Sequence, residues 1–189
     1  METIFSYLAE HFDLPILDWI RSTVACPALD LLMPKLTLLG DAGMVWIMLA
    51  ALLLLRPKHR RAGITVAAAL ILGLVVCNLC MKPLFARIRP YDYQLLRFGK
   101  EIPLLIQAER DFSFPSGHTI ASFEAATALW LYNKKWGTWA MVLAVLIAFS
   151  RLYLYVHYPT DVICSVILGM GIGLLSFQLV NRLPKPKPL

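Results

Sequence analysis

The chain has 189 residues, of which 59% are hydrophobic and 16% are charged, and its mean hydropathy is +0.66. A water-soluble domain of this length would carry more charge, so the composition predicts an integral membrane protein. The net charge of +6 does not indicate nucleic-acid binding, because the cations stand at the ends of apolar runs and form no stripe with stacking aromatics.

Residues 1–38 are amphipathic, and acidic residues and prolines interrupt their apolar positions. A segment of this kind is expected to lie in the plane of the membrane interface. It does not resemble a signal peptide, because Glu2, Glu10 and Asp13 stand where a basic region would be required.

Five apolar stretches follow, and each has about the length that crosses a hydrocarbon core of about 30 Å. We therefore predict an all-α fold, a single polytopic membrane bundle of five transmembrane helices preceded by the interfacial helix. A polar loop at 82–114 separates the second and third spans, and loops of this length tend to be functional. The predicted spans are residues 38–55, 62–81, 116–132, 136–155 and 160–180.

The distribution of charge predicts the orientation of these spans. The links after the first and third spans and the C-terminal tail share one side, and they carry Lys and Arg but no acidic residue. Because dense basic clusters in short loops face the cytoplasm, we expect a multi-pass protein of the cytoplasmic membrane with 82–118 and 151–161 on its outer face. The basic residues are Arg56, Lys58, Arg60, Arg61, Lys134, Lys135, Arg182, Lys185 and Lys187.

The stretch Phe114-Pro115-Ser116-Gly117-His118 marks the start of the third span. Serine is a favoured helix N-cap, and glycine lets the backbone come close to a ligand. The N–H groups and the positive dipole end of a helix start favour anions. The stretch therefore predicts an anion site, with His118 in the first helical turn.

Two further groups of polar residues are expected on the same face. Lys82 and Arg89 follow the second span, and Arg151 closes the fourth. Three such cations can surround a tetrahedral dianion, with arginine suited to bidentate contact.

Two histidines at such a site suit a two-step displacement, in which one attacks phosphorus and the other protonates the leaving oxygen. His157 lies four residues before Asp161, so the carboxylate can orient the imidazole if the stretch is helical. Pro159 between them is compatible with a helix only in its first turn.

Each of these residues alone has a simpler interpretation. A cation at a helix end often snorkels to the interface, and a lone histidine there is often a solvated or capping residue. Asp161 could cap the fifth span. Because all three groups fall on one predicted face, we favour a shared site.

The chain resembles the type-2 phosphatidic-acid phosphatase superfamily in three motifs, Lys82-x6-Arg89-Pro90, Pro115-Ser116-Gly117-His118 and Ser150-Arg151-x5-His157-x3-Asp161. That superfamily includes integral-membrane lipid phosphatases, soluble acid phosphatases and vanadate haloperoxidases. A haloperoxidase is disfavoured here because the spans leave little soluble body.

The resemblance implies that His157 is the nucleophile, which forms a phosphohistidine, and that Asp161 orients it. It implies that His118 is the general acid for the leaving group and then the base for water. The residues implied to hold the phosphoryl oxygens are Lys82, Arg89, Ser116, Gly117 and Arg151.

Members of this kind use no metal, and we expect no cofactor. Cys77 and Cys80 share a helix face, but further Cys or His ligands at suitable spacing do not follow them. The expected partners are a lipid phosphate substrate and membrane lipids.

Small bacterial members with this layout resemble undecaprenyl-diphosphate phosphatases, phosphatidylglycerophosphate phosphatases and broad-range lipid phosphatases. An outward-facing site favours conversion of undecaprenyl diphosphate to undecaprenyl phosphate. The alternatives are a phosphatidate or phosphatidylglycerophosphate phosphatase and a lipid phosphotransferase with the same site. A lipid transporter or structural bundle is disfavoured, because this chain lacks the broken helices and paired half-repeats expected of a transporter.

Two features have no place in the signature. Residues 91–114 carry apolar side chains that could enter the interface and select the lipid, or they pack passively over the helix ends. Glu124 is an acid in the middle of a predicted span, and we expect it to face the bundle as a hydrogen-bond partner.

Overall fold

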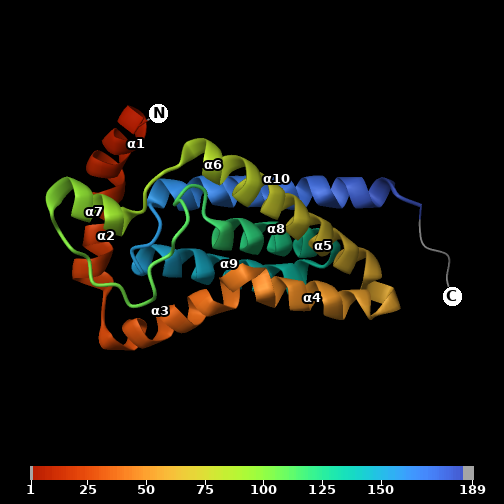
Figure 1. Ribbon diagram of the computed structural model, residues 1–189. Coiled ribbons are helices and arrows are strands. Elements are labelled where there is room, and N and C mark those ends of the chain that lie inside the picture. The colour runs from red at the N-terminus through yellow and green to blue at the C-terminus, as the bar shows by residue number, and fades with distance from the viewer. Residues whose placement is uncertain (1, 185–189) are drawn as a thin grey trace.

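The computed structural model describes residues 2–184, and all regular structure within them is helical (Figure 1). This confirms the predicted all-α fold. Short 3-10 or π segments join several of the helices. The helices are α1 (Glu2–Leu8), α2 (Leu14–Trp19), α3 (Pro27–Gly40), α4 (Met44–Leu54), α5 (Arg60–Leu74), α6 (Lys82–Phe85), α7 (Pro90–Phe98), α8 (Gly117–Tyr132), α9 (Lys134–Tyr153) and α10 (Pro159–Arg182).

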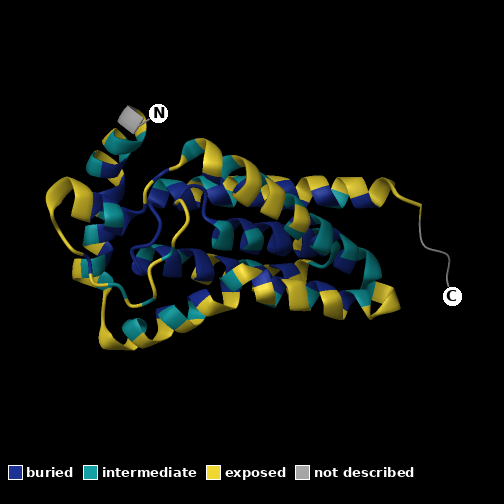
Figure 2. Ribbon diagram, viewed as in Figure 1, coloured by how far each residue is buried: buried dark blue, intermediate teal, exposed yellow. Residues whose placement is uncertain are grey.

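Helix α8 forms the centre of the bundle, where α5, α9 and α10 pack against it (Figures 1 and 2). Small residues allow the close approach of these helices. A Cβ at Gly169 of α10 would lie 2.8 Å from the carbonyl oxygen of Ile120, and one at Gly173 would lie 2.6 Å from that of Glu124. Ala125 and Ala126, which are fully buried, occupy the same core.

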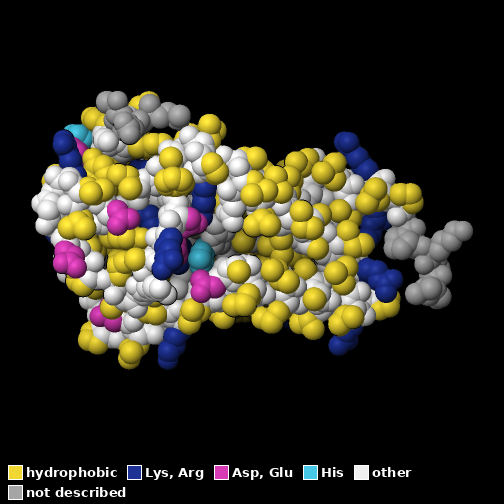
Figure 3. Space-filling model, viewed as in Figure 1, with side chains coloured by type: hydrophobic (Ala, Val, Ile, Leu, Met, Phe, Trp, Pro, Cys, Tyr) yellow, Lys and Arg dark blue, Asp and Glu magenta, His cyan; other side chains and the backbone are white. Residues whose placement is uncertain are grey.

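The face of the bundle seen in Figure 3 is largely apolar along its length. Leu52, Ile71, Trp139 and Ile167 are each more than 60% exposed, which is favourable in lipid and not in water. Together with the long apolar helices, this surface makes the chain a multi-pass membrane protein. The stretches that are long and apolar enough to cross are Pro27–Leu54, Pro57–Phe98, Lys134–Tyr153 and Pro159–Arg182.

The fifth predicted span, 116–132, coincides with α8, which has only 16 residues. Because the other helices enclose it, its sequence does not need the uniform hydropathy of a lipid-facing helix. The structure therefore has four clear candidate spans, and the count of five crossings stays a prediction.

Most predicted spans match the helices to within about two residues, but two predicted segments differ more clearly. Residue 38, the predicted start of the first span, lies inside α3, and the helix begins at Pro27 because a proline favours the first helical turn. The predicted loop at 82–114 contains two helices, α6 and α7.

The segment before α3 is nearly continuous helix to Val24 and lies across the end of the bundle (Figure 1), a position compatible with the predicted interfacial role. At the opposite end, the described basic residues of the α4–α5 link, the α8–α9 link and the end of α10 gather (Figure 3). Lys185 and Lys187 of the predicted tail lie outside the described residues.

Candidate active site

The three motifs meet at one end of the bundle, beside the N-terminal helices and α7 (Figure 1). The motifs lie on different elements, but all of these reach the same end: the segment that follows α5, the start of α8, and the connection between α9 and α10. The predicted residues are Lys82 and Arg89 around α6 and α7, Ser116, Gly117 and His118 at the start of α8, Arg151 in the last turn of α9, His157 in the connection, and Asp161 in the first turn of α10.

The three predicted cations are buried and form one cluster. Arg89 and Arg151 are almost fully buried, and Lys82 is 9% exposed. Buried cations need partners, and two carboxylates from the segment before α8 supply them. Glu109 accepts from Arg89 at 2.5 Å and also from Arg151, while Asp111 accepts from Arg89 at 2.6 Å and also from Lys82.

The charges in this cluster keep both carboxylates ionised. Burial opposes ionisation, but the positive charges of Arg151 and Arg89 lower the pKa of Glu109 from 4.5 to about 2. For Asp111, burial is likewise outweighed by its bond to Lys82 and by Arg89, and its pKa falls to about 2. The cluster is thus arranged to hold several anionic oxygens at once.

His157 borders this cluster. Its Nε2 lies 3.3 Å from Nη1 of Arg89. Burial, reinforced by the charges of Arg89 and Arg151, holds the pKa of His157 well below its ordinary 6.5. The imidazole is therefore neutral at neutral pH, as a nucleophile must be.

Asp161 does not orient His157 by a direct hydrogen bond, which corrects the expected contact. Its Oδ2 lies 3.7 Å from Nδ1 of the histidine. The hydroxyl of Ser113 stands between them, 2.5 Å from Asp161 and 3.5 Å from Nδ1. Pro159 occupies the first position of α10, as predicted, so the helix places the carboxylate one turn beyond the histidine.

Arg87 is a residue of the site that the sequence analysis missed. It is buried, and it donates to Asp161 at 2.5 Å and to Asp13 at 2.7 Å. Its guanidinium lies 3.8 Å from the centre of the Tyr158 ring. Asp13 ties the N-terminal helices to the site, because it also accepts from Thr160. The signal in the sequence that could have revealed Arg87 is its position two residues before Arg89.

The start of α8 forms as predicted. Ser116 caps it, since its Oγ accepts from the Thr119 N–H at 3.4 Å, while its own N–H donates to Ser165 at 2.8 Å. The Ser116 N–H is therefore not free for a ligand. The N–H groups of Gly117 and His118 belong to the first turn, which has no intrahelical acceptors.

His118 has a carboxylate partner that the sequence analysis did not find. Its Nε2 lies 2.7 Å from Oδ1 of Asp41, which follows α3 and is distant in sequence. The imidazole is mostly buried, with 15% of its side chain exposed.

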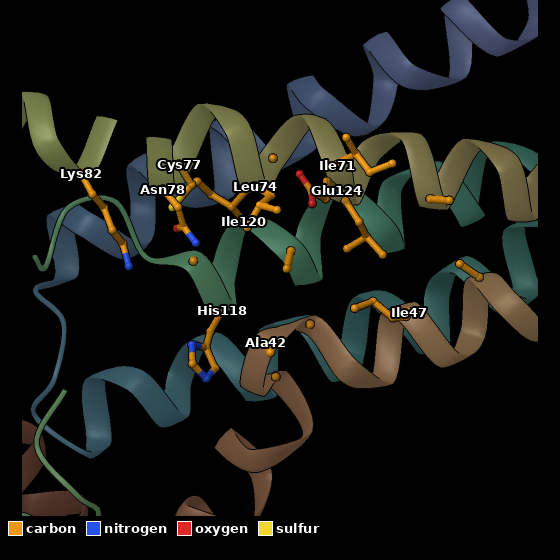
Figure 4. A pocket seen from close by; sticks show the side chains of 18 of the residues that line it. Ala42, Ile47, Ile71, Leu74, Cys77, Asn78, Lys82, His118, Ile120 and Glu124 are labelled. Carbon is orange, nitrogen blue, oxygen red and sulfur yellow. The ribbon is translucent and has the colours of Figure 1, made fainter. Parts of the chain in front are cut away.

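A cavity of about 670 Å³ opens from these residues. Lys82, His118 and His157 line one end of it, and the rest runs between α4 and α5 (Figure 4). Apart from Glu124, the side chains along this part are mostly apolar. They include Ile47, Ala51, Leu54, Leu70, Ile71 and Leu74.

Glu124 lies in the wall of this cavity and faces the bundle, as expected (Figure 4). The expected hydrogen bond is missing, since its Oε2 has no partner among the described residues. A Cβ at Gly73 would overlap the carboxyl group, so α5 makes room for this side chain. Across residues 2–184, no group of three or more His, Cys, Asp or Glu side chains is placed to hold a metal ion.

The apolar side chains of residues 91–114 lie in two environments. Leu104 and Ile106 pack against a buried cluster, which fits passive packing. The side chains that remain exposed, and available to an interface, are Leu95, Leu96, Phe98 and Leu105.

Comparison with known proteins agrees with the motifs. Residues 62–185 match the PAP2 superfamily. The chain belongs to this superfamily. It is therefore a membrane phosphatase of the PAP2 type, which confirms the resemblance and the hydrolase class predicted from the motifs.

Two similar proteins differ in the substrate that their names give. The undecaprenyl-diphosphatase of Sulfolobus acidocaldarius is 35% identical over 145 residues, which are 76% of this chain and 67% of that protein. The lipid A 4'-phosphatase of Bacteroides thetaiotaomicron is 30% identical over 150 residues, covering 74% and 66% of the two chains.

The crystal structure of LpxE from Aquifex aeolicus shares the fold, with a TM-score of 0.75 and 26% identity. The superposition covers 88% of this chain and 94% of the LpxE chain.

Proposed function

We propose that this phosphatase converts undecaprenyl diphosphate to undecaprenyl phosphate through a phosphohistidine at the outer face of the cytoplasmic membrane. The observation that carries the proposal is the buried cluster of Lys82, Arg89 and Arg151 beside the neutral His157, at the mouth of an apolar cavity. Cations bind the phosphate oxygens, the histidine supplies the nucleophile and the cavity accepts a lipid chain.

The first step forms a bond between Nε2 of His157 and the terminal phosphorus. The bond from phosphorus to the lipid-side oxygen breaks, and His118 gives that oxygen a proton. In the second step water attacks the phosphorus, His118 accepts its proton, and the bond from nitrogen to phosphorus breaks to release inorganic phosphate.

The cations stabilise the charge that develops on the transferred group. Phosphoryl oxygens would replace the carboxylates of Glu109 and Asp111, which now bond to the same three cations. The N–H groups of Gly117 and His118 add a helix N-terminus to the oxyanion site.

Two observations support a long lipid chain as the leaving part of the substrate. The cavity between α4 and α5 is lined mostly by apolar side chains, and both helices belong to stretches that are long and apolar enough to cross a membrane. The similarity to the Sulfolobus undecaprenyl-diphosphatase favours a polyprenyl chain, and the Bacteroides relative makes a lipid A phosphate an alternative, beside phosphatidate and phosphatidylglycerophosphate.

The substrate test uses the purified chain in detergent with EDTA. Undecaprenyl diphosphate, phosphatidate, phosphatidylglycerophosphate and lipid A are offered separately, and released phosphate is measured. We expect the highest kcat/KM with undecaprenyl diphosphate; preference for another lipid would refute the substrate assignment. A product that appears only with an added lipid acceptor would identify a phosphotransferase.

The mechanistic test compares His157→Ala with His59→Ala. His59 lies at the opposite end of the bundle, where its ring is 4.8 Å from that of Trp136, and its loss should leave turnover unchanged. His157→Ala should abolish turnover and the acid-labile phosphoenzyme label. Full activity of His157→Ala with several lipid phosphates would contradict the nucleophile assignment.

The proposed orientation is supported by the basic residues at the end of the bundle opposite the site (Figure 3). It is tested with single cysteines in a chain whose four native cysteines are replaced by serine. Glu101 and Lys135 are exposed at opposite ends. In intact cells Glu101→Cys should react with an impermeant thiol reagent and Lys135→Cys should not; the reverse pattern would place the site inside.

A further inference from the structure

Asp41 stands where the first long apolar stretch is interrupted. Helix α3 ends at Gly40, a short turn spans Asp41–Gly43, and α4 begins at Met44. Ala42 and Gly43 have φ values of 48° and 68°, in the left-handed region that a residue with a side chain rarely adopts. Such conformations persist where the surroundings hold them and are common at active sites.

The interruption places this turn directly against the His118 imidazole. Oδ1 of Asp41 lies 2.7 Å from Nε2. A Cβ at Gly40 would lie 2.8 Å from Cδ2 of the same ring and 2.9 Å from Cγ2 of Ile147. A residue without a side chain is therefore required at Gly40 for the ring to pack there.

The carboxylate has no other structural task in the described part of the chain. It caps neither the turn nor α4. Its one hydrogen bond and its one ion pair within residues 2–184 are both with His118. A carboxylate that served only to cap the start of α4 would accept from backbone N–H groups.

We propose that Asp41 is the positioning residue for His118 in the phosphoryl transfer described above. By accepting from Nε2–H it leaves Nδ1 as the nitrogen that carries the transferable proton, and its negative charge stabilises the imidazolium form. The proton moves from Nδ1 to the leaving oxygen as the bond from phosphorus to oxygen breaks. Asp41 stays ionised and keeps its bond to Nε2 throughout.

Each histidine of the site thereby has its own carboxylate. His157 is oriented by Asp161 of α10 through Ser113. His118 is oriented by Asp41, which lies in the turn between α3 and α4. The two carboxylates act on opposite sides of the transferred group, one behind the nucleophile and one behind the acid.

The test compares two substrates whose leaving groups differ in their need for a proton. It rests on the proposed function. Dodecanol leaves poorly without protonation, whereas p-nitrophenolate leaves as the anion. Asp41→Asn should lower kcat/KM for dodecyl phosphate roughly 10- to 100-fold and change that for p-nitrophenyl phosphate less than about threefold. The later hydrolysis of the phosphoenzyme is common to both substrates, so it does not affect the comparison of their kcat/KM values.

His118→Ala should show the same selective loss, and Gly40→Ala should do so too because it crowds the ring. The matched control is Asp30→Asn, since Asp30 lies in α3, which ends just before Asp41, and accepts from the Tyr153 hydroxyl at 2.6 Å; it should leave both rates unchanged. An equal loss on both substrates, or no loss, in Asp41→Asn would overturn the role of Asp41 and leave the phosphatase proposal intact. A wild-type chain that hydrolyses neither phosphate, nor any lipid of the panel, would overturn the proposed function.

Discussion

Arg87 offers the sharpest test of how the site is held together. Its guanidinium bonds to two fully buried carboxylates, Asp13 and Asp161. The substitution Arg87→Met keeps an unbranched side chain between the rings of Phe5 and Tyr158 but removes the positive charge. Two carboxylates from distant parts of the chain then lack their cation.

The expected cost follows from the bonds that remain. Removal of one partner from a buried ion pair costs about 3–5 kcal/mol. Asp13 keeps two bonds from Thr160, at 2.9 and 2.8 Å. Asp161 keeps the Ser113 hydroxyl at 2.5 Å and the Tyr158 N–H at 3.1 Å. Because each carboxylate stays partly satisfied, we expect a total loss of about 3–5 kcal/mol in the free energy of unfolding and not twice that amount.

Turnover should fall as well, because Asp161 loses the bond that fixes it behind His157. We expect a decrease of about 10-fold or more. The free energy of unfolding is measured by chemical denaturation in detergent, and turnover by phosphate release.

The control is Arg97→Met. Arg97 pairs with Glu10 at 3.2 Å, but the two side chains are 64% and 28% exposed, so this variant should lose less than about 1 kcal/mol. If Arg87→Met is no less stable than Arg97→Met, the buried pairs do not stabilise the fold in the way described.

Further predictions concern packing and pH. Gly137→Ala should destabilise the fold by about 2 kcal/mol, because a Cβ there would overlap the backbone of Trp130; Gly171→Ala, where a Cβ meets nothing within 4 Å, should change stability by less than about 1 kcal/mol. Stability should also fall as the pH drops from about 4.5 to 2. The pKa of Glu109 is about 2 in the folded chain against an ordinary 4.5, so the unfolded chain takes up the proton first. The resulting loss in the free energy of unfolding is at most about 3 kcal/mol. For catalysis, the low pKa of His157 predicts that protonation of the nucleophile lowers kcat/KM only at pH values below 6.5.

Thermal unfolding distinguishes the two glycine variants, and equal melting temperatures would contradict the packing argument. Glu109→Gln should remove the part of the acid destabilisation that this carboxylate causes; an unchanged pH dependence would exclude it as a source. A nucleophile that titrates at or above pH 6.5 would show that burial and the two arginines do not depress its pKa.

Local sequence determined a large part of this molecule. Apolar runs and their length predicted helices in a membrane, and Ser116 and Pro159 marked helix starts that the structure confirms. These features depend on capping, backbone conformation and hydropathy, all of which act within a few residues. Sequence order also placed the three motifs at one end, because consecutive spans must alternate in direction.

Only the tertiary structure decided how the site's charges are paired. Glu109, Asp111, Asp41 and Arg87 stood in the sequence as ordinary charged residues. Their partners are up to 77 positions away, so no periodicity or spacing connects them. Burial makes each pairing necessary, because a cation or carboxylate removed from water must be satisfied by whatever group the packing brings within reach.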